Sequence, residues 1–258
     1  MTTQKAVVLI TGCSSGIGQS LARAFHRHGH LVCATARDVT SLEELRLQGI
    51  MVHELDITNR ESIEALLAGL RKVGRYVGTL INNAGQGVMG RSLMYRTMSG
   101  QGLVINISSV SGVMATPFAG PYCASKAALN AASDALRMEL EPFGVRVVTV
   151  QPGGIQSSFG HKAASCVSLA SNSVYQPVKD GVLLRANESQ VGAMPSDEFA
   201  EELAKMVADR QCPPVIRLGK KSSTMPLMKN LLPTRWLDRI LQRRFNLDHL
   251  RKVKVIQS

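Results

Sequence analysis

The sequence predicts an α/β protein with one domain, built on a doubly wound parallel sheet. Three observations predict this class. Short β-branched apolar runs recur along the chain, amphipathic stretches of helical spacing separate them, and a glycine-rich turn follows the first run. A chain of 258 residues, 45% of them hydrophobic, is long enough to bury the core of one large α/β domain. We expect a single domain over 1–258, with a core at 5–155, an irregular substrate region at 156–195 and a basic extension at 219–258.

The strands are expected where β-branched and aliphatic residues run together. The first run, AVVLI, leads directly into Thr11-Gly12. The later runs are of similar length and alternate with helical patterns, as crossover connections require. The expected strands cover 6–10, 31–36, 51–57, 79–84, 103–108, 145–150 and, late in the chain, 214–218.

The helices are expected between these strands, and glycines mark the ends of the first three. Gly29, Gly49 and Gly74 follow the periodic stretches, where a residue able to adopt a left-handed backbone is needed. The tetrapeptide Thr58-Asn59-Arg60-Glu61 is typical of a capping box at the start of the third helix. The expected helices cover 17–28, 41–48, 59–73, about 121–142 and 196–210.

Composition argues against several classes of protein, namely disulfide-rich, metal-binding, secreted and membrane-spanning ones. The five cysteines are odd in number and widely spaced, and the six histidines form no ligand pattern, so neither a disulfide framework nor a metal site is expected. The N-terminal apolar run is too short for a signal peptide or a spanning helix. We therefore expect a soluble, cytoplasmic protein. Of the net charge of +11, most lies in the tail, where ten basic and two acidic side chains between Gly219 and Ser258 give +8.

The turn after the first strand has the chemistry of a dinucleotide site. Gly12, Gly16 and Gly18 are spaced as G-x-x-x-G-x-G and lead into a helix. Glycines let the backbone turn sharply and approach a pyrophosphate, and the helix N-terminus offers free N–H groups to the anion. Surface turns also collect glycine, but the place of this turn between a buried strand and a helix favours cofactor binding.

This spacing, together with four later segments, resembles the short-chain dehydrogenase family over roughly residues 5–160. The segments are Asp56-Ile57, Asn82-Asn83-Ala84-Gly85, Ser109 followed by Tyr122-Cys123-Ala124-Ser125-Lys126, and Pro152-Gly153. The resemblance implies a Rossmann-type fold and hydride transfer between a nicotinamide cofactor and an alcohol or ketone. The family's usual threonine is Ser157 here, which keeps a hydroxyl. The implied cofactor-binding residues are Gly12, Ser14, Ser15, Gly16, Ile17, Gly18, Arg37, Asp56, Ile57, Asn83, Ala84, Gly85, Tyr122, Lys126, Pro152, Gly153, Ile155 and Ser157.

Charge at the end of the second strand favours NADP(H) as the cofactor. An acidic residue there would bond the ribose 2′-hydroxyl of NAD and repel a 2′-phosphate, but the strand ends Thr35-Ala36-Arg37. Ser14 can add a hydroxyl donor, as in similar NADP-using proteins. The alternative is that Arg37 is solvated and Asp38 supplies the acid one position late.

Tyr122 and Lys126 lie four residues apart near the start of a helix, which places them on one face. Ketone reduction needs a proton donor at oxygen, and a phenol with an unperturbed pKa of about 10 is poorly matched to neutral pH. A neighbouring ammonium lowers that pKa. We expect Tyr122 to be the general acid and base and Lys126 to tune it and hold the ribose. Family spacing selects Ser109 over Ser108 as the group that bonds the developing alkoxide.

The chain departs from the family between Gly85 and Gly102, where only 16 residues connect two strands. Similar proteins carry a long helix there, which contributes a catalytic asparagine. Neither Asn82 nor Asn106 can replace it, because both sit in strand motifs. The crossover remains feasible, with two helical turns in SLMYRTM, but we expect a slower or less stable protein. The alternative function is therefore a catalytically impaired NADP(H)-binding protein with a regulatory or binding role.

The substrate class follows from resemblance to the hydroxysteroid and retinol dehydrogenase branch, which implies a lipophilic alcohol or ketone. In the tail, TRWLDRILQRRF places Trp236, Leu237, Ile240 and Leu241 on one stripe. This stripe could dock at the substrate mouth or make a peripheral lipid contact. A nucleic-acid partner is not expected, because no reader motif is present; the oligomeric state is left open. Phe159, Val167, Leu169, Val174, Tyr175 and Val178 are the apolar candidates for substrate contacts.

Overall fold

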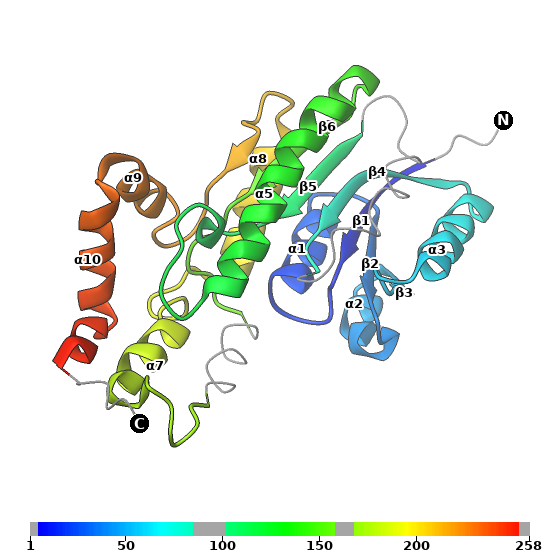
Figure 1. Ribbon diagram of the computed structural model, residues 1–258. Coiled ribbons are helices and arrows are strands. Elements are labelled where there is room, and N and C mark those ends of the chain that lie inside the picture. The colour runs from blue at the N-terminus through cyan, green and yellow to red at the C-terminus, as the bar shows by residue number, and fades with distance from the viewer. Residues whose placement is uncertain (1–4, 85–101, 158–167, 253–258) are drawn as a thin grey trace.

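The computed structural model describes residues 5–84, 102–157 and 168–252. Its strands form one seven-stranded parallel sheet in the order β3-β2-β1-β4-β5-β6-β7 (Figure 1). The predicted single α/β domain with a doubly wound parallel sheet is confirmed. The strands are β1 (Lys5–Thr11), β2 (Val32–Ala36), β3 (Met51–Glu54), β4 (Arg75–Asn82), β5 (Leu103–Ile107), β6 (Arg146–Val150) and β7 (Val215–Ile216).

Helices lie on both sides of the sheet, and two further helices stand beyond it near the C-terminus (Figure 1). Within the described residues, no helix is long and apolar enough to span a bilayer. The α-helices are α1 (Gly16–Arg27), α2 (Glu43–Leu47), α3 (Arg60–Lys72), α5 (Gly120–Leu140), α7 (Lys179–Asn187), α8 (Ser196–Ala208), α9 (Thr224–Leu231) and α10 (Thr234–Arg244).

The central strand β1 shows how both faces of the sheet are buried. Val8 and Ile10 pack with residues of α1 and α8, whereas Val7 and Leu9 pack with the apolar residues of α3. Successive side chains of a strand point to opposite faces, so a strand covered on both sides needs an uninterrupted apolar run. This explains the apolar runs from which the strands were predicted.

On the α3 side of the sheet, the described residues form two separate apolar clusters. One joins β1 and β4 to α3, and the other joins Val104 and Val147 to Leu136 and Leu140 of α5. In the sequence, the connection from β4 to β5 consists mostly of residues 85–101, which lie outside the described residues. Its expected helical turns in SLMYRTM fall at 92–98, outside the described residues, and remain a prediction.

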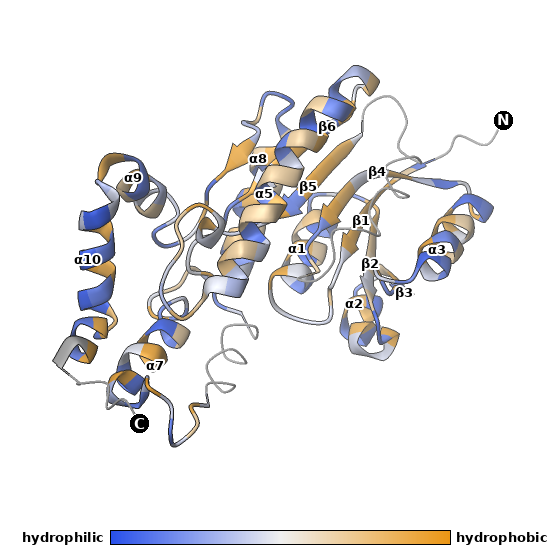
Figure 2. Cartoon of the chain, viewed as in Figure 1, coloured by the Kyte–Doolittle hydropathy of each residue, from blue (hydrophilic) through white to orange (hydrophobic). Residues whose placement is uncertain are grey.

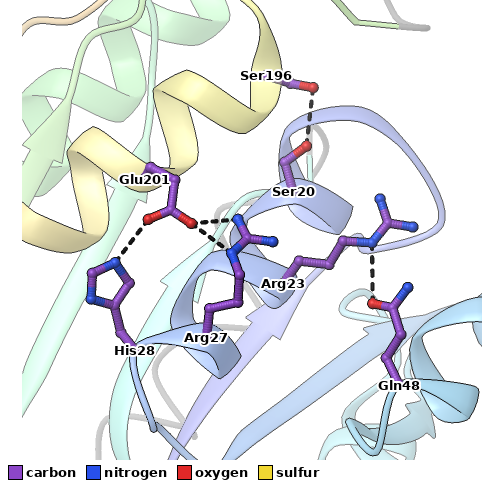
Figure 3. A network of polar contacts seen from close by, with 7 residues as sticks. All are labelled: Ser20, Arg23, Arg27, His28, Gln48, Ser196 and Glu201. Carbon is purple, nitrogen blue, oxygen red and sulfur yellow. Dashed lines mark hydrogen bonds and ion pairs between the residues drawn. The ribbon is translucent and has the colours of Figure 1, made fainter.

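The helices α1 and α8 are held together by a polar network (Figure 3). One carboxylate oxygen of Glu201 accepts hydrogen bonds from the Arg27 guanidinium, and the other accepts from His28 Nε2 at 2.8 Å. Ser20 Oγ donates to Ser196 Oγ at 3.0 Å. These bonds fix a helix from late in the chain against the helix that follows the glycine turn.

The glycines expected to follow the first three helices are confirmed, and the observed helix bounds differ from the expected ones by up to two residues. Gly29, Gly49 and Gly74 all have positive φ, at 80°, 81° and 68°. The third helix begins one residue later than expected. Asn59, rather than Thr58, caps it by accepting hydrogen bonds from two backbone N–H groups, because Thr58 is engaged with the Asp56 carboxylate.

Every strand differs from its expected bounds by at least one residue, and the largest shifts are at the start of β4 and the end of β3. The strand β4 begins at Arg75 rather than at residue 79, because its first residues pair with Lys5 to Val7 of β1. The strand β3 ends at Glu54 rather than at residue 57. The residues that follow it turn at once towards the cap of α3, since Ser62 Oγ accepts the N–H of Asp56 at 3.0 Å.

Candidate active site

A cavity of about 1270 Å³ opens at the carboxyl ends of the strands. The strand order reverses between β1 and β4, and such a switch point is where open α/β sheets bind ligands. The predicted Gly85 lies outside the described residues. The other predicted site residues line the cavity together: Gly12, Ser14, Ser15, Gly16, Ile17, Gly18, Arg37, Asp56, Ile57, Asn83, Ala84, Ser109, Tyr122, Lys126, Pro152, Gly153, Ile155 and Ser157.

The glycine turn has the shape that close contact with a pyrophosphate requires. Gly12 and Gly16 adopt positive φ, at 73° and 60°. A Cβ at Gly18 would lie 2.2 Å from the carbonyl oxygen of Gly12, so only glycine fits there. The backbone therefore approaches the cavity closely, directly before the N-terminus of α1. These residues fit a dinucleotide phosphate.

The end of β4 holds this turn in place through a residue that sequence reasoning missed. Thr11 Oγ1 accepts hydrogen bonds from the N–H groups of Asn83 and Ala84, both at 3.1 Å. Asn83 Nδ2 in return donates to the carbonyl oxygens of Thr11 and Gly12 at 3.0 and 2.9 Å. A threonine at the end of a strand carries no distinctive pattern, and only the pairing of β1 with β4 gives it this role.

At the other end of the cofactor region, the structure separates the functions of Arg37 and Asp38. Arg37 lines the cavity. The carboxylate of Asp38 accepts from the N–H and hydroxyl of Thr40 at 2.9 and 2.6 Å, and so caps the short helical turn that follows β2. Hydrogen bonds from Thr40 lower the pKa of Asp38. Asp38 thus stabilises the local fold. This favours Arg37, rather than Asp38, as the charged side chain that would contact the ribose end of the cofactor.

The proposed catalytic side chains meet at the start of α5. Ser109 and Tyr122 are hydrogen-bonded through their hydroxyl groups. Lys126 Nζ lies 6.0 Å from the centre of the Tyr122 ring and donates to the carbonyl oxygen of Ile107 at 3.1 Å. Ser108 donates its hydroxyl to the backbone carbonyl of Lys126 at 3.2 Å. The two serines therefore have different partners, and it is Ser109 that faces the phenol.

Burial changes the expected charge balance at the phenol. From the sequence, Lys126 is expected to lower the pKa of Tyr122. In the structure the pKa of Tyr122 is raised, because burial outweighs the hydrogen bond from Ser109 and the positive charge of Arg185, which both lower it. A raised pKa keeps the phenol protonated at neutral pH, the form that donates a proton during reduction.

A buried polar chain fixes α5 against the sheet. Asn82 Nδ2 donates to Asn106 Oδ1 at 2.8 Å, and Asn106 Nδ2 donates to Ser133 Oγ at 2.9 Å. All three residues are almost fully buried. Asn82 and Asn106 are therefore engaged in holding β4, β5 and α5 together, in agreement with the inference that neither replaces the missing asparagine.

The substrate end of the cavity contains residues that no motif indicated. Phe118 has a positive φ of 63°, and its ring packs edge-on against Tyr175 at 5.8 Å. Gln190 accepts the N–H of Ser157 at 3.2 Å and donates to the carbonyl of Ile155, which ties the segment after β6 to the chain beyond α7. The wall at α7 is made by Val182, Arg185 and Ala186.

Four of the six apolar candidates for substrate contacts do not line the cavity. Val174 and Tyr175 are exposed and Val178 is buried, and these three and Leu169 do not line the cavity. Phe159 and Val167 lie outside the described residues. Without a helical or strand periodicity, the residue type does not show which way a side chain points. The sequence therefore could not select Phe118 or the α7 residues.

Comparison with known proteins agrees with this geometry. A family model described as short chain dehydrogenase matches residues 6–99 and 88–166. An NADPH-dependent 1-acyldihydroxyacetone phosphate reductase of Schizosaccharomyces pombe is 34% identical over 210 residues, covering 70% of this chain and 71% of that protein. A short-chain dehydrogenase/reductase of Pestalotiopsis microspora is 30% identical over 276 residues, covering 99% and 100%. The crystal structure of a short-chain dehydrogenase from Streptomyces avermitilis has a TM-score of 0.71 at 25% identity, covering 96% and 98%.

Proposed function

This chain belongs to the short-chain dehydrogenase family of oxidoreductases, and from that premise we propose that it interconverts a lipophilic secondary alcohol and ketone, or an alcohol and aldehyde, with NADP(H). One observation carries the proposal. The hydroxyl pair of Ser109 and Tyr122, with Lys126 beside it, lies in the same cavity as the glycine turn. A carbonyl held at these hydroxyls would be within reach of a cofactor bound along that turn.

The side chains have separate tasks in this reaction. The nicotinamide, when bound, supplies the hydride. Tyr122 donates its phenolic proton to the carbonyl oxygen during reduction and takes it back from the alcohol during oxidation. Ser109 donates a hydrogen bond to the oxygen as negative charge develops on it. Lys126 stabilises the phenolate left after proton transfer and holds the ribose.

The preference for NADP(H) rests on charge. Arg37 lines the cavity at the end of β2, while Asp38 is occupied as a helix cap. A guanidinium favours a 2′-phosphate through charge-assisted hydrogen bonds. The relative in Schizosaccharomyces pombe is named as NADPH-dependent, which supports the same preference here.

The substrate proposal combines resemblance with a relative's name. Resemblance to the hydroxysteroid and retinol dehydrogenase branch implies a lipophilic alcohol or ketone. The relative named as a 1-acyldihydroxyacetone phosphate reductase acts on a ketone that carries an acyl chain. Both point to a lipophilic ketone. We assign substrate binding to the described part of 156–195, chiefly α7, with 5–155 as the cofactor core.

A peripheral lipid contact is part of the proposal, located on α9 and α10. Leu227 and Leu231 on α9, and Trp236 and Ile240 on α10, are exposed pairs with a spacing of i, i+4, which puts each pair on one face of its helix. Leu237 is buried, so the expected apolar stripe is divided between core and surface. Cations on these helices complement an anionic bilayer: Lys229, Arg235, Arg239, Arg243 and Arg244, against Asp238 alone.

The function is tested by following NADPH absorbance with a panel of lipophilic ketones and aldehydes. We expect turnover by the parent and loss of turnover in Tyr122→Phe, which keeps the ring but removes the transferable proton. Calorimetry should show that this variant still binds NADP+. Tyr76→Phe, at the second residue of β4 and away from the cavity, is the matched control and should behave as the parent.

Two outcomes contradict parts of this proposal, the first the role of Tyr122 and the second the enzyme activity. Turnover by Tyr122→Phe at the rate of the parent would assign the proton to another group. Tight NADP(H) binding without turnover of any ketone or aldehyde would favour the alternative, a catalytically impaired NADP(H)-binding protein, which the missing asparagine makes reasonable.

A further inference from the structure

The substrate end of the cavity carries a cation that has no acidic partner. Arg185 of α7 lines the cavity and is partly buried. Its Nε donates to Thr116 Oγ1 at 2.6 Å, and Thr116 is itself buried. No carboxylate in the described part of the chain lies within ion-pairing distance of Arg185. The segments outside that part, 1–4, 85–101, 158–167 and 253–258, contain no aspartate or glutamate.

Among the described residues, the one acid near this end of the cavity is already paired with two cations. Glu188 lines the cavity, but Lys221 Nζ donates to its carboxylate at 2.8 Å and the guanidinium of Arg244 donates to the same oxygen. Lys220 also lines the cavity and donates to the carbonyl of Val191 at 2.8 Å. The substrate end therefore has an excess of positive charge that the protein does not compensate.

The guanidinium is held in a defined position while most of its donors are left for a ligand. The bond to Thr116 uses the N–H on Nε, and the two Nη groups carry four more N–H bonds. Gly181, one turn earlier on α7, packs so closely that a Cβ there would lie 2.0 Å from the carbonyl oxygen of Phe245. This contact fixes the helix that carries Arg185. Arg185 is close enough to Tyr122 for its charge to act on the phenol.

We propose that Arg185 binds an anionic group of the substrate, a phosphate or a carboxylate, while the carbonyl of the same molecule lies at Tyr122. This assignment rests on the proposed function and adds a specificity-determining residue to it. A planar guanidinium fixed at Nε can bond two oxygens of an anion side by side, and a partly buried cation without a counterion gains most from such a ligand. Lys220 and Lys221 at the same end strengthen the attraction for a doubly charged group.

The test compares two ketones that differ in one charge-bearing group. An acyldihydroxyacetone phosphate and the same acyldihydroxyacetone without its phosphate are reduced with NADPH. We expect the parent to prefer the phosphate ketone by about 10- to 100-fold in kcat/KM, which corresponds to one charge-assisted hydrogen bond. In Arg185→Gln we expect the preference to be lost through a higher KM for the phosphate ketone. Arg185→Lys should retain part of it.

Two controls separate ligand binding from loss of structure. Arg60→Gln removes the same charge from an exposed position on α3 and should keep the preference of the parent. Calorimetric titration of the NADP+-saturated chain with octyl phosphate gives a readout without turnover, and this binding should weaken in Arg185→Gln but not in Arg60→Gln. Melting temperatures show whether Arg185→Gln folds, and Arg185→Lys is the second variant if it does not.

The outcomes distinguish this inference from the proposed function. Equal kcat/KM for the two ketones in the parent overturns the role of Arg185 while the reductase function stands. If neither ketone is reduced, that function fails for these substrates, and the octyl phosphate titration still decides the inference: equal binding by parent and Arg185→Gln overturns it. An acyl-chain ketone ending in a carboxylate is the third substrate. Reduction of this ketone in preference to the phosphate supports Arg185 as an anion site and assigns the carboxylate.

Discussion

At the residue scale, Arg37 is the position where one charge is expected to choose the cofactor. Its guanidinium lines the cavity where the adenosine ribose of a dinucleotide would lie. A charge-assisted hydrogen bond is worth about 1.5–3 kcal/mol. We therefore expect Arg37→Ala to lose about tenfold or more in affinity for NADP+ and to keep its affinity for NAD+. Calorimetric titration of both cofactors measures the two constants.

The control for this prediction is Arg46→Ala, which removes an exposed arginine of the neighbouring helix α2. It should leave both affinities unchanged, because Arg46 does not line the cavity. Tighter binding of NAD+ than of NADP+ by the parent, or unchanged NADP+ affinity in Arg37→Ala, would contradict the charge argument.

A second residue-scale prediction concerns the ionisation of Tyr122. Burial raises the pKa of this phenol above its ordinary value of about 10.0. The folded protein therefore binds this proton more tightly than the unfolded chain. Tyr122 contributes stability below the unfolded pKa, and that contribution is lost as the pH rises through the folded pKa. In an alkaline titration of phenolate absorbance, we expect the component missing from Tyr122→Phe to titrate above the midpoint of free tyrosine. A midpoint at or below that of free tyrosine would show that burial does not dominate.

Residues that local motifs place were predicted from sequence to lie together, and they line one cavity. The glycine turn, Ser109 and the Tyr122 helix each keep their spacing within one strand, turn and helix, so the sequence could place them in one cavity. Arg185 and Thr116 are 69 residues apart and meet only through the fold. No spacing rule connects them, and for this reason sequence reasoning missed Arg185.

At the element scale, the helix ends marked by glycine were predictable and the strand ends were not. Gly29, Gly49 and Gly74 require a backbone that other residues rarely adopt, so each carries a local signal. The start of β4 depends on which residues of β1 lie opposite, a property of pairing that the sequence of β4 does not contain. The tail helix α10 was predicted as one apolar stripe, but burial of Leu237 with exposure of Trp236 depends on its tertiary packing.

The contact between α1 and α8 gives a prediction for an element interface. Hydrogen bonds from Arg27 and His28 lower the pKa of Glu201. Partly exposed pairs of this kind contribute about 0.2–1 kcal/mol each. We expect Glu201→Gln to lower the free energy of unfolding by an amount of that order at neutral pH, measured by urea denaturation. Because the folded pKa of Glu201 is lowered, its contribution is present above the unfolded value and lost as the pH falls through the folded one.

The pH dependence therefore separates this effect from a general loss of packing. The difference between parent and Glu201→Gln should shrink in acid, where Glu201 itself becomes protonated. Glu202→Gln removes the same charge from the next position of α8, which has no ion pair in the described part of the chain, and should change stability less. A difference that stays constant from neutral pH into acid would assign the effect to packing.

At the scale of the whole molecule, α9 and α10 extend the protein beyond its sheet, on the side away from α3 (Figure 1). Hydrophilic and hydrophobic residues alternate along α10 (Figure 2). Trp236 is 62% exposed and Leu231 is 70% exposed. Met225 of α9 also lines the cavity. The helix α9 therefore contributes both to the proposed lipid surface and to the wall of the cavity. A lipophilic substrate could then pass from a bilayer into the cavity along α9.

Vesicle binding tests this surface, and the chain supplies its own probe because Trp236 is its one tryptophan. Transfer of an indole from water to the bilayer interface should shift its fluorescence to shorter wavelength. We expect this shift with anionic phosphatidylglycerol vesicles and a weak shift with phosphatidylcholine vesicles. The shift should decrease with salt, because each lysine or arginine near an anionic surface contributes about 1 kcal/mol.

Leu231→Ser should weaken the binding to vesicles. Leu47→Ser, which changes an exposed side chain of α2 at the far edge of the sheet, should not. A shift that appears without lipid and grows with protein concentration would instead assign this face to contact between two copies of the chain. Equal shifts with both kinds of vesicle would remove the electrostatic part of the argument.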